Sequence, residues 1–356
     1  MLGAGIFSLS FFVFLYIDIG ANAMATLFPR DTLRAEFLRC FAAGVQGEVL
    51  RCMHERMPGW VERYGPASVV GELEYYGEHF GETTTCHAVG HIVGEALYEH
   101  VGDLSAIGYA TNACHASVFH GVQGAFVEAR GVEAFREEVI GRRLCDRWRE
   151  DEQVYQLCTH GIGHALMVGA GYDYLEAAMA CRGLEDAEHP DDVGAPLCVS
   201  GIFMELFDGT VGGHAAMEFH SDENDVFWPC TDGRLSNQDK AMCFSHIHSR
   251  LMRNTSYWEK GGVELCRKEA PAEWVRRCSW GAGYVNAAIN IYRLDYTVTA
   301  CRRTDSPDLR NACFIGALSW LRVGESAAQK TEEFCAKLSD KERATCQAPS
   351  SAHNNR

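Results

Sequence analysis

The cysteines of this chain recur in pairs whose members are a nearly constant number of residues apart. Six pairs are separated by 11 to 13 positions and a seventh by 17. Residues 12 apart on one α-helix lie about 18 Å from each other, whereas a disulfide requires Cα atoms within about 7 Å. Each pair can therefore bond only where the chain reverses direction between its members. The pairs are Cys40–Cys52, Cys145–Cys158, Cys181–Cys198, Cys230–Cys243, Cys266–Cys278, Cys301–Cys313 and Cys335–Cys346.

The sequence around Cys181 and Cys198 indicates how the chain reverses. A segment with helical apolar spacing, LEAAMACRGL, contains Cys181; a turn-rich segment follows, and the apolar run LCVSGIFMELF contains Cys198. From Cys158 onward the second cysteines recur at steps of 33 to 45 residues, the period of a two-helix repeat. The sequence therefore predicts an all-α fold, a disulfide-stapled array of helix hairpins stacked as an α-solenoid or α–α superhelix. The last pair, Cys86–Cys114, follows by elimination.

Several of the expected second helices carry a glycine three positions after the cysteine. These are Gly161, Gly201, Gly281 and Gly316. Glycine has no side chain beyond hydrogen, so it permits two helices to approach closely. We expect these positions to be contacts between adjacent second helices.

The N-terminus and the cysteine content both favour an oxidising compartment. An apolar run covers residues 5–17 and is followed by Ala21-Asn22-Ala23, a small-x-small pattern that suits cleavage before Met24. No Lys or Arg precedes the run, so residues 1–23 are expected to be either a signal peptide or an uncleaved N-terminal anchor. Sixteen cysteines persist as disulfides where the surroundings oxidise thiols. The predicted location is secreted, periplasmic or the secretory-pathway lumen.

The acidic net charge of the chain limits the classes of molecule that it is expected to bind. The formal net charge is −16 and no block of basic residues occurs, which argues against a nucleic-acid partner. A small molecule or a protein is the expected substrate, and membrane contact is expected only through an uncleaved N-terminus. Asn254 begins a sequon and is a glycosylation candidate. We divide the rest of the chain into histidine-bearing hairpins over 24–255, scaffold or partner-surface hairpins over 256–346 and a disordered tail over 347–356.

Histidines supply the candidate chemistry. His87 and His91, and again His160 and His164, are spaced i, i+4, which places each pair on one face of a helix. His120 begins a similar stripe on another expected helix. Because the stripes lie on equivalent helices of adjacent hairpins, we expect these five imidazoles to share one metal site.

Two glutamates extend the stripes. Glu95 lies at i+8 from His87, and Glu128 at i+8 from His120, so each is either a further ligand or a solvated surface charge. Imidazole and carboxylate together suit a transition metal such as Fe, Cu or Zn. The remaining histidines near these helices, His115, His214, His220, His246 and His248, are interpreted as hydrogen-bonded polar residues without a metal.

Several familiar chemistries are excluded by missing motifs. Neither His-x-x-x-His segment holds the glutamate of a zincin helix, and no haem-attachment, G-x-S-x-G or P-loop motif occurs. The His-x-x-x-His spacing is similar to that of membrane fatty-acid desaturases and hydroxylases, although the helices that hold those boxes in a membrane are absent here.

Two functions remain open from the sequence. The first is a lumenal oxidoreductase or hydroxylase that uses non-haem iron or copper at the histidine cluster. The second is a non-catalytic protein, either a solenoid that binds a protein or glycan, or a metal carrier or sensor. Aromatic residues replace the histidines in the C-terminal units, at Trp280, Tyr284 and Trp320, so we expect no ligands there.

Overall fold

The computed structural model describes residues 32–80, 84–185, 194–208, 225–252, 257, 261–322 and 327–347. Every regular element in these ranges is a helix, so the predicted all-α class is confirmed. No helix within them is long and apolar enough to cross a bilayer. The signal or anchor segment 1–23, the sequon at Asn254, the histidines His214 and His220, and the tail from residue 348 lie outside the described residues.

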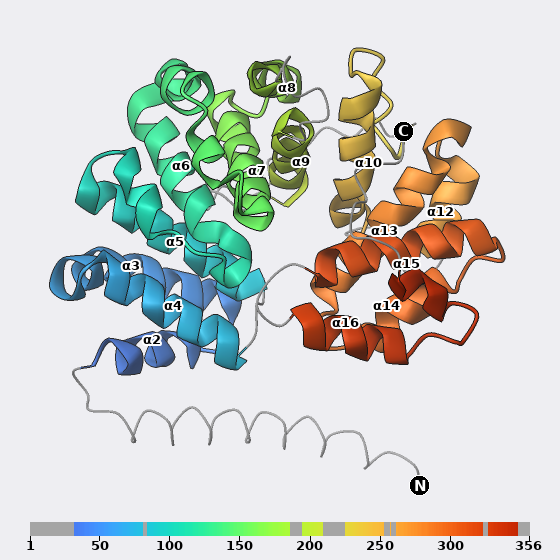
Figure 1. Cartoon of the computed structure of the whole chain (residues 1–356), viewed down its shortest axis with the longest axis horizontal. Helices are drawn as coiled ribbons and strands as arrows, with labels where there is room; N and C mark the ends of the chain where they lie inside the picture. The colour runs from blue at the N-terminus through green and yellow to red at the C-terminus, as the bar shows by residue number, and fades with distance from the viewer. Residues whose placement is uncertain are drawn as a thin grey trace, which may run out of the picture.

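Longer helices form most of the structure and short 3₁₀ or π turns connect some of them (Figure 1). The α-helices are α2 (Leu33–Phe41), α3 (Gln46–Tyr64), α4 (Pro66–Phe80), α5 (Thr84–Val101), α6 (Ala113–Phe135), α7 (Glu152–Gly169), α8 (Tyr174–Cys181), α9 (Gly194–Asp208), α10 (Asn237–Leu251), α12 (Gly262–Glu269), α13 (Val275–Ile289), α14 (Leu294–Cys301), α15 (Pro307–Leu321) and α16 (Ala327–Ala336). The short turns are η1 (Leu104–Tyr109), η2 (Arg136–Gly141), η3 (Leu144–Trp148), η4 (Arg182–Leu184), η5 (Ala272–Trp274) and η6 (Arg343–Gln347).

Eight disulfides link the chain in the expected pairs, seven of them indicated by the spacing and the eighth, Cys86–Cys114, by elimination. In five units the bridge joins two α-helices, as a hairpin requires: α2 with α3, α5 with α6, α8 with α9, α12 with α13, and α14 with α15. In others one arm is not an α-helix: Cys145 lies in η3, and Cys230 lies in a turn before α10. The spacing therefore identifies the chain reversal but not the type of arm.

Local capping explains several helix starts. The side chain of Asp151 accepts a hydrogen bond from a first-turn N–H of α7, and Asp173 does the same for α8. Ser236 and Asp239 form a reciprocal capping box at α10. Such caps satisfy N–H groups that have no partner within the helix, and each stabilises it by about 1 kcal/mol.

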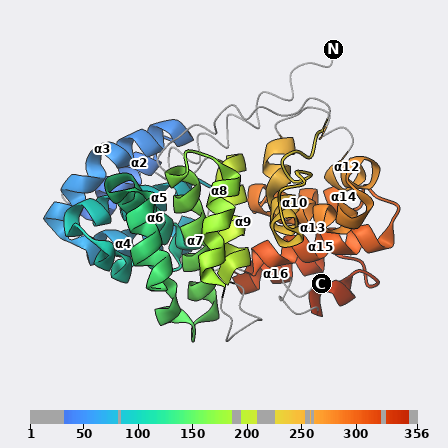
Figure 2. The ribbon, with the colours of Figure 1, turned by 90° about the horizontal axis from the view of Figure 1, so that it is seen from above.

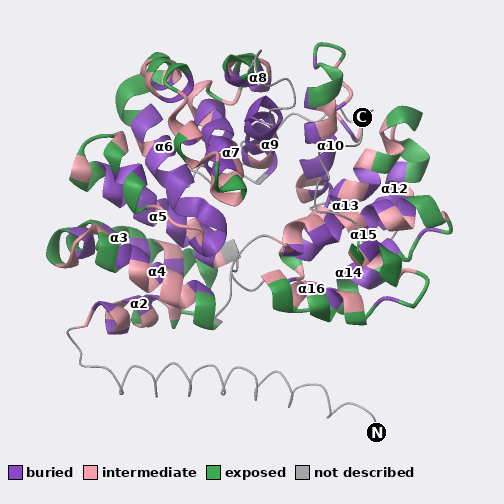
Figure 3. Cartoon of the chain, viewed as in Figure 1, coloured by how far each residue is buried: buried purple, intermediate pink, exposed green. Residues whose placement is uncertain are grey.

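The second helices pack on one another in chain order to form an inner layer. The contacts run from α5 to α6, α7, α9, α10, α13 and α15. Seen from above, the elements up to α9 form one half of the molecule and those from α10 onward the other (Figure 2). Buried residues concentrate on the inner-layer helices, most visibly α5, α6, α7 and α9 (Figure 3).

The two ends of this layer meet, which an open solenoid does not predict. The ring of Trp320 on α15 lies 4.4 Å, centroid to centroid, from the ring of His115 at the start of α6. Trp320 also lies 5.2 Å from Tyr284, which lies 5.5 Å from His246 on α10. The predicted solenoid stacking is therefore not confirmed. Cysteine spacing sets each hairpin but carries no information on the rotation between hairpins.

Glycine pairs bring the inner helices into backbone contact. A Cβ atom at Gly94 would lie 2.8 Å from Gly121 Cα, so α5 and α6 touch there. Gly163 of α7 packs against the Cys198 carbonyl of α9, while Gly201 of α9 packs against the His160 carbonyl of α7. Gly283 and Gly316 repeat this contact between α13 and α15. No larger residue fits without moving a helix, as the sequence pattern indicates for Gly201 and Gly316.

We predict that Gly163→Ala destabilises the protein by about 1–3 kcal/mol or more, because its methyl group would overlap the Cys198 carbonyl oxygen. The matched control is Gly59→Ala in α3, where nothing lies within 4 Å of the added carbon. That change should stabilise the protein by about 0.5–1 kcal/mol, the helix preference of alanine over glycine. Urea unfolding of the three proteins measures both effects. Equal stabilities for the two variants would contradict the close contact.

Candidate metal centre

The structure brings five histidines into one cluster. His87 and His91 come from α5, His120 from α6, and His160 and His164 from α7. Neighbouring rings lie 4.7 to 6.1 Å apart between centroids, and the shortest separation is that of the stacked rings of His120 and His164. We call these five residues the central histidine cluster.

The glycine contacts explain why the rings converge. Gly121 follows His120 directly and packs on the His91 carbonyl, so α5 and α6 approach at the level of the rings. A Cβ at Gly161 would lie 2.6 Å from the His120 ring, so this glycine leaves the space that the ring fills. The i, i+4 spacing on α5 and α7 then turns both pairs toward His120.

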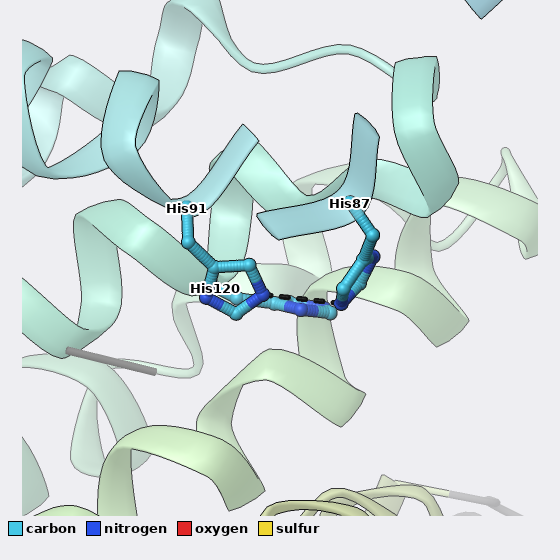
Figure 4. Close-up of side chains that lie close together, drawn as sticks. All are labelled: His87, His91 and His120. Atoms are coloured by element: carbon cyan, nitrogen blue, oxygen red, sulfur yellow. Dashed lines mark hydrogen bonds between the residues drawn. The ribbon is translucent and has the colours of Figure 1, made fainter. Parts of the chain in front are cut away.

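The first group in the cluster is His87, His91 and His120, whose ligand atoms all lie within 4.8 Å of one another (Figure 4). His87 Nδ1 donates to the Cys114 carbonyl at 3.0 Å, so the one proton of the neutral ring lies on Nδ1 and Nε2 is a free lone pair. His91 Nε2 lies 3.1 Å from that nitrogen. Among the described residues, His91 Nδ1 and both ring nitrogens of His120 have no hydrogen-bond partner although they are buried.

An unusual backbone turn holds the acceptor of His87. Residues 114–116 are left-handed, with φ between 53° and 57°, although none is glycine. Such conformations cost of order 1–3 kcal/mol each and concentrate at functional sites. The turn precedes the regular part of α6 and directs His115 toward Trp320, with its ring 6.5 Å from that of His87 at the edge of the central cluster.

The second group is His160 and His164, whose Nε2 atoms lie 3.1 Å apart. His164 Nδ1 donates to Glu205 on α9 at 2.9 Å, and both side chains are fully buried. Tyr172 donates its hydroxyl hydrogen to the other oxygen of Glu205 at 3.0 Å. A carboxylate that accepts from the outer nitrogen of a histidine fixes the ring and leaves its inner nitrogen free, as around many protein-bound metals.

Burial favours the neutral form of four of the five imidazoles in the cluster. Desolvation lowers the pKa of His87 to about 4, partly offset by its hydrogen bond to Cys114. Desolvation, with repulsion from neighbouring imidazoles, lowers the pKa values of His91, His120 and His160 well below the usual range. Neutral imidazole is the form that binds a metal ion, so no proton has to leave these rings at pH 7.

The two glutamates predicted as ligands are not at the cluster. Glu95 lies 3.8 Å from His54 of α3, and Glu128 is exposed. Eight residues along a helix correspond to about 12 Å of rise and about 80° of rotation beyond two turns. The i+8 position therefore leaves the face that carries the histidines, and these positions favour the second of the two predicted alternatives, a surface charge, over a further ligand.

Three residues that lie beside the central histidine cluster were not predicted from the sequence. Glu205 and Met204 lie in α9 and Tyr172 follows α7. Glu205 carried a signal, because it is the only charged residue in the apolar run from Leu197 to Phe207 and a carboxylate is rarely buried without a partner. Met204 occupies the position in its repeat that His164 holds in the preceding one, whereas Tyr172 had no comparable signal.

Two further histidines lie outside the cluster. His246 Nε2 is 2.8 Å from the Ser200 hydroxyl, and its ring faces those of His160 and Tyr284. His248 points to the other side of α10, as the two-residue spacing predicts. There it lies beside the sulfurs of Cys266 and Cys278, a geometric set of three potential metal ligands.

This second set is not a metal site, because its sulfurs form a disulfide. His248 is instead fully hydrogen-bonded: Nε2 donates to the Cys278 carbonyl at 2.9 Å, and Nδ1 accepts from Tyr257 at 3.0 Å. The polar interpretation of His248 from sequence agrees with these contacts.

No protein-family model, curated protein or solved structure matches the chain. The described geometry by itself places a histidine group that could hold a metal inside a disulfide-rich helical fold. The eight disulfides suggest an oxidising, secreted or lumenal compartment.

We predict that acidification destabilises the protein in part through His248. Burial lowers its pKa from 6.5 to about 4, so below pH 6.5 the unfolded state takes up a proton that the folded state does not. The free energy of unfolding should therefore fall between pH 6.5 and about 4, by roughly 3 kcal/mol from this group.

Urea unfolding at pH 7.0 and pH 4.5 tests this prediction. His248→Gln should lower stability at pH 7.0 and lose less stability on acidification than the unchanged protein. His100→Gln, at an exposed position near the end of α5, is the control. The same pH dependence in the unchanged protein and in His248→Gln would contradict the assignment.

Proposed function

We propose that the protein is a metal-dependent oxidoreductase of an oxidising compartment and that His87, His91 and His120 bind its metal. The observation that carries this proposal is the convergence of three buried, neutral imidazoles, of which His91 lacks a partner at Nδ1 and His120 at both ring nitrogens among the described residues. A buried polar atom without a partner costs about 1–3 kcal/mol, and one bound cation would satisfy several at once.

The donor set favours copper or zinc over iron, and of these two only copper is redox-active, as the proposed function requires. Imidazole suits Zn, Cu, Fe and Ni, whereas non-haem iron oxygenases and the harder ions rely on a carboxylate ligand. Glu205 has the one carboxylate that the described residues place against the cluster, and it hydrogen-bonds the outer nitrogen of His164 instead of facing the inner nitrogens. Three protein ligands leave a coordination position for a substrate, and a redox-active ion there would supply electron transfer.

The chain's own residues prepare this site in defined ways. The Cys114 carbonyl holds the proton of His87 on Nδ1, so that Nε2 is unprotonated and can bind a metal ion. The packing of Gly121 against the His91 carbonyl fixes the distance between α5 and α6. Burial of all three rings excludes water, which keeps them neutral.

The burial argues against a carrier, which has to exchange its ion at the surface. His120 is 1% exposed and His91 4% exposed. The aromatic residues Trp280, Tyr284 and Trp320 do not support an outer partner surface either, because they contact one another and the histidines beside the cluster. The expected substrate is thus a small molecule, which we retain as part of the proposal.

We predict that the full chain, produced in an oxidising compartment and loaded with Cu(II), binds copper and that His120→Ala greatly reduces the binding. Removing one of three ligands leaves two, so the affinity for copper should fall by about tenfold to a hundredfold or more. Elemental analysis gives the copper content. Electron paramagnetic resonance should show nitrogen coupling that is lost in the variant and a signal that ascorbate bleaches reversibly.

Two matched controls accompany this experiment. Glu95→Gln and His100→Ala change residues of α5 that lie off the cluster, and both should retain the copper. Circular dichroism verifies that each variant keeps its helices. Copper content unaffected by His120→Ala would overturn the site. Selective binding of zinc instead of copper would overturn the oxidoreductase, because zinc has no redox chemistry.

A further inference from the structure

We propose a second metal position beside the first, formed by His160, His164 and Met204 and selective for Cu(I). It rests on the proposed function, since it extends the same histidine cluster. His160 Nε2 lies 3.1 Å from His164 Nε2 and 3.3 Å from the Met204 sulfur. The distances from His160 Nε2 to the other two donor atoms, His164 Nε2 and the Met204 sulfur, are therefore those expected between two ligands of one metal ion.

These separations fit a shared ion. Metal–nitrogen bonds of about 2.0–2.1 Å at a tetrahedral angle place two nitrogens about 3.3 Å apart, and a metal–sulfur bond of about 2.3 Å places sulfur and nitrogen about 3.5 Å apart. The observed 3.1 and 3.3 Å are slightly shorter than these values. A small movement of the side chains outward would admit the ion.

The location of the protons supports the same assignment. His164 carries its proton on Nδ1, where Glu205 accepts it, so its Nε2 presents a lone pair to His160. Tyr172 donates to Glu205 as well and holds the carboxylate in place. This is the outer-shell support that commonly orients metal-bound histidines.

Met204 faces the cluster because of its place in the repeat. Aligned on Gly161 of α7 and Gly201 of α9, Ser200 and Met204 occupy the positions of His160 and His164. The stripe that presents imidazoles on α7 therefore presents a thioether on α9. A thioether is a soft ligand that selects Cu(I) among the metals considered for imidazole sites.

The second position differs from the first in donor type and exposure. His160 and Met204 are partly exposed, whereas His87, His91 and His120 are buried. The stacked rings of His120 and His164, 4.7 Å apart, join the two groups. The cluster would thus hold two copper ions in different ligand sets, three nitrogens in one and two nitrogens with one sulfur in the other.

Anaerobic titration of the full chain with Cu(I) against a chromophoric Cu(I) chelator tests the proposal. The unchanged protein should retain two ions, Met204→Leu one, and His120→Ala one. As a control, Met167→Leu changes a buried methionine of α7 that is not one of the proposed ligands and should retain two ions. X-ray absorption should show a copper–sulfur distance of about 2.3 Å that disappears in Met204→Leu.

The outcomes separate this inference from the function on which it rests. One ion that is lost in His120→Ala, with no sulfur scattering, would leave the three-histidine site standing and overturn the second position. Two ions in Met204→Leu would also overturn it, and would show that the contact between His160 and Met204 is only a weak hydrogen bond. No bound copper in the unchanged protein would overturn both proposals.

Discussion

Backbone contact between inner helices at glycine is the constraint on which the rest of the structure depends. Gly121 against the His91 carbonyl, and Gly201 against the His160 carbonyl, bring the helices together where the rings project. A side chain at either glycine would separate the helices and move the imidazoles out of ligand distance. The same contacts therefore build the core and determine whether the cluster can bind an ion.

This arrangement is costly, and the disulfides offset the cost. Buried polar atoms without partners, such as both ring nitrogens of His120 within the described part of the chain, each lower stability by about 1–3 kcal/mol. A left-handed turn at residues 114–116 adds to this cost. A disulfide that closes a loop of 12 or 13 residues stabilises by about 3 kcal/mol through the unfolded state. Covalent closure of each unit thus permits a polar centre that an apolar core of this size would otherwise exclude.

The local features of the fold could be predicted from the sequence, because they depend on short spacings. The cysteine intervals indicate chain reversals, and the i, i+4 histidines indicate a shared helix face. The sequence could not place Glu205 beside His164, because that pairing spans 41 residues and depends on the rotation of α9 against α7. It also could not show that Trp320 meets His115, since closure depends on small rotations added over all hairpins. The sequence also left Glu95 open between ligand and surface charge, because at i+8 the helix has already turned by about 80° from the histidine face.

One scaffold serves two purposes along the chain. Trp280 and Tyr284 on α13 occupy the positions that His160 and His164 hold on α7, and the ring separations are similar, 5.1 and 4.9 Å. The glycine contacts are also repeated, with Gly283 and Gly316 in place of Gly163 and Gly201. The backbone geometry of the pair is therefore the same in both halves. Side-chain type alone determines whether a pair offers nitrogen ligands or packs as apolar surface, so the imidazoles of α7 are not a requirement of helix packing.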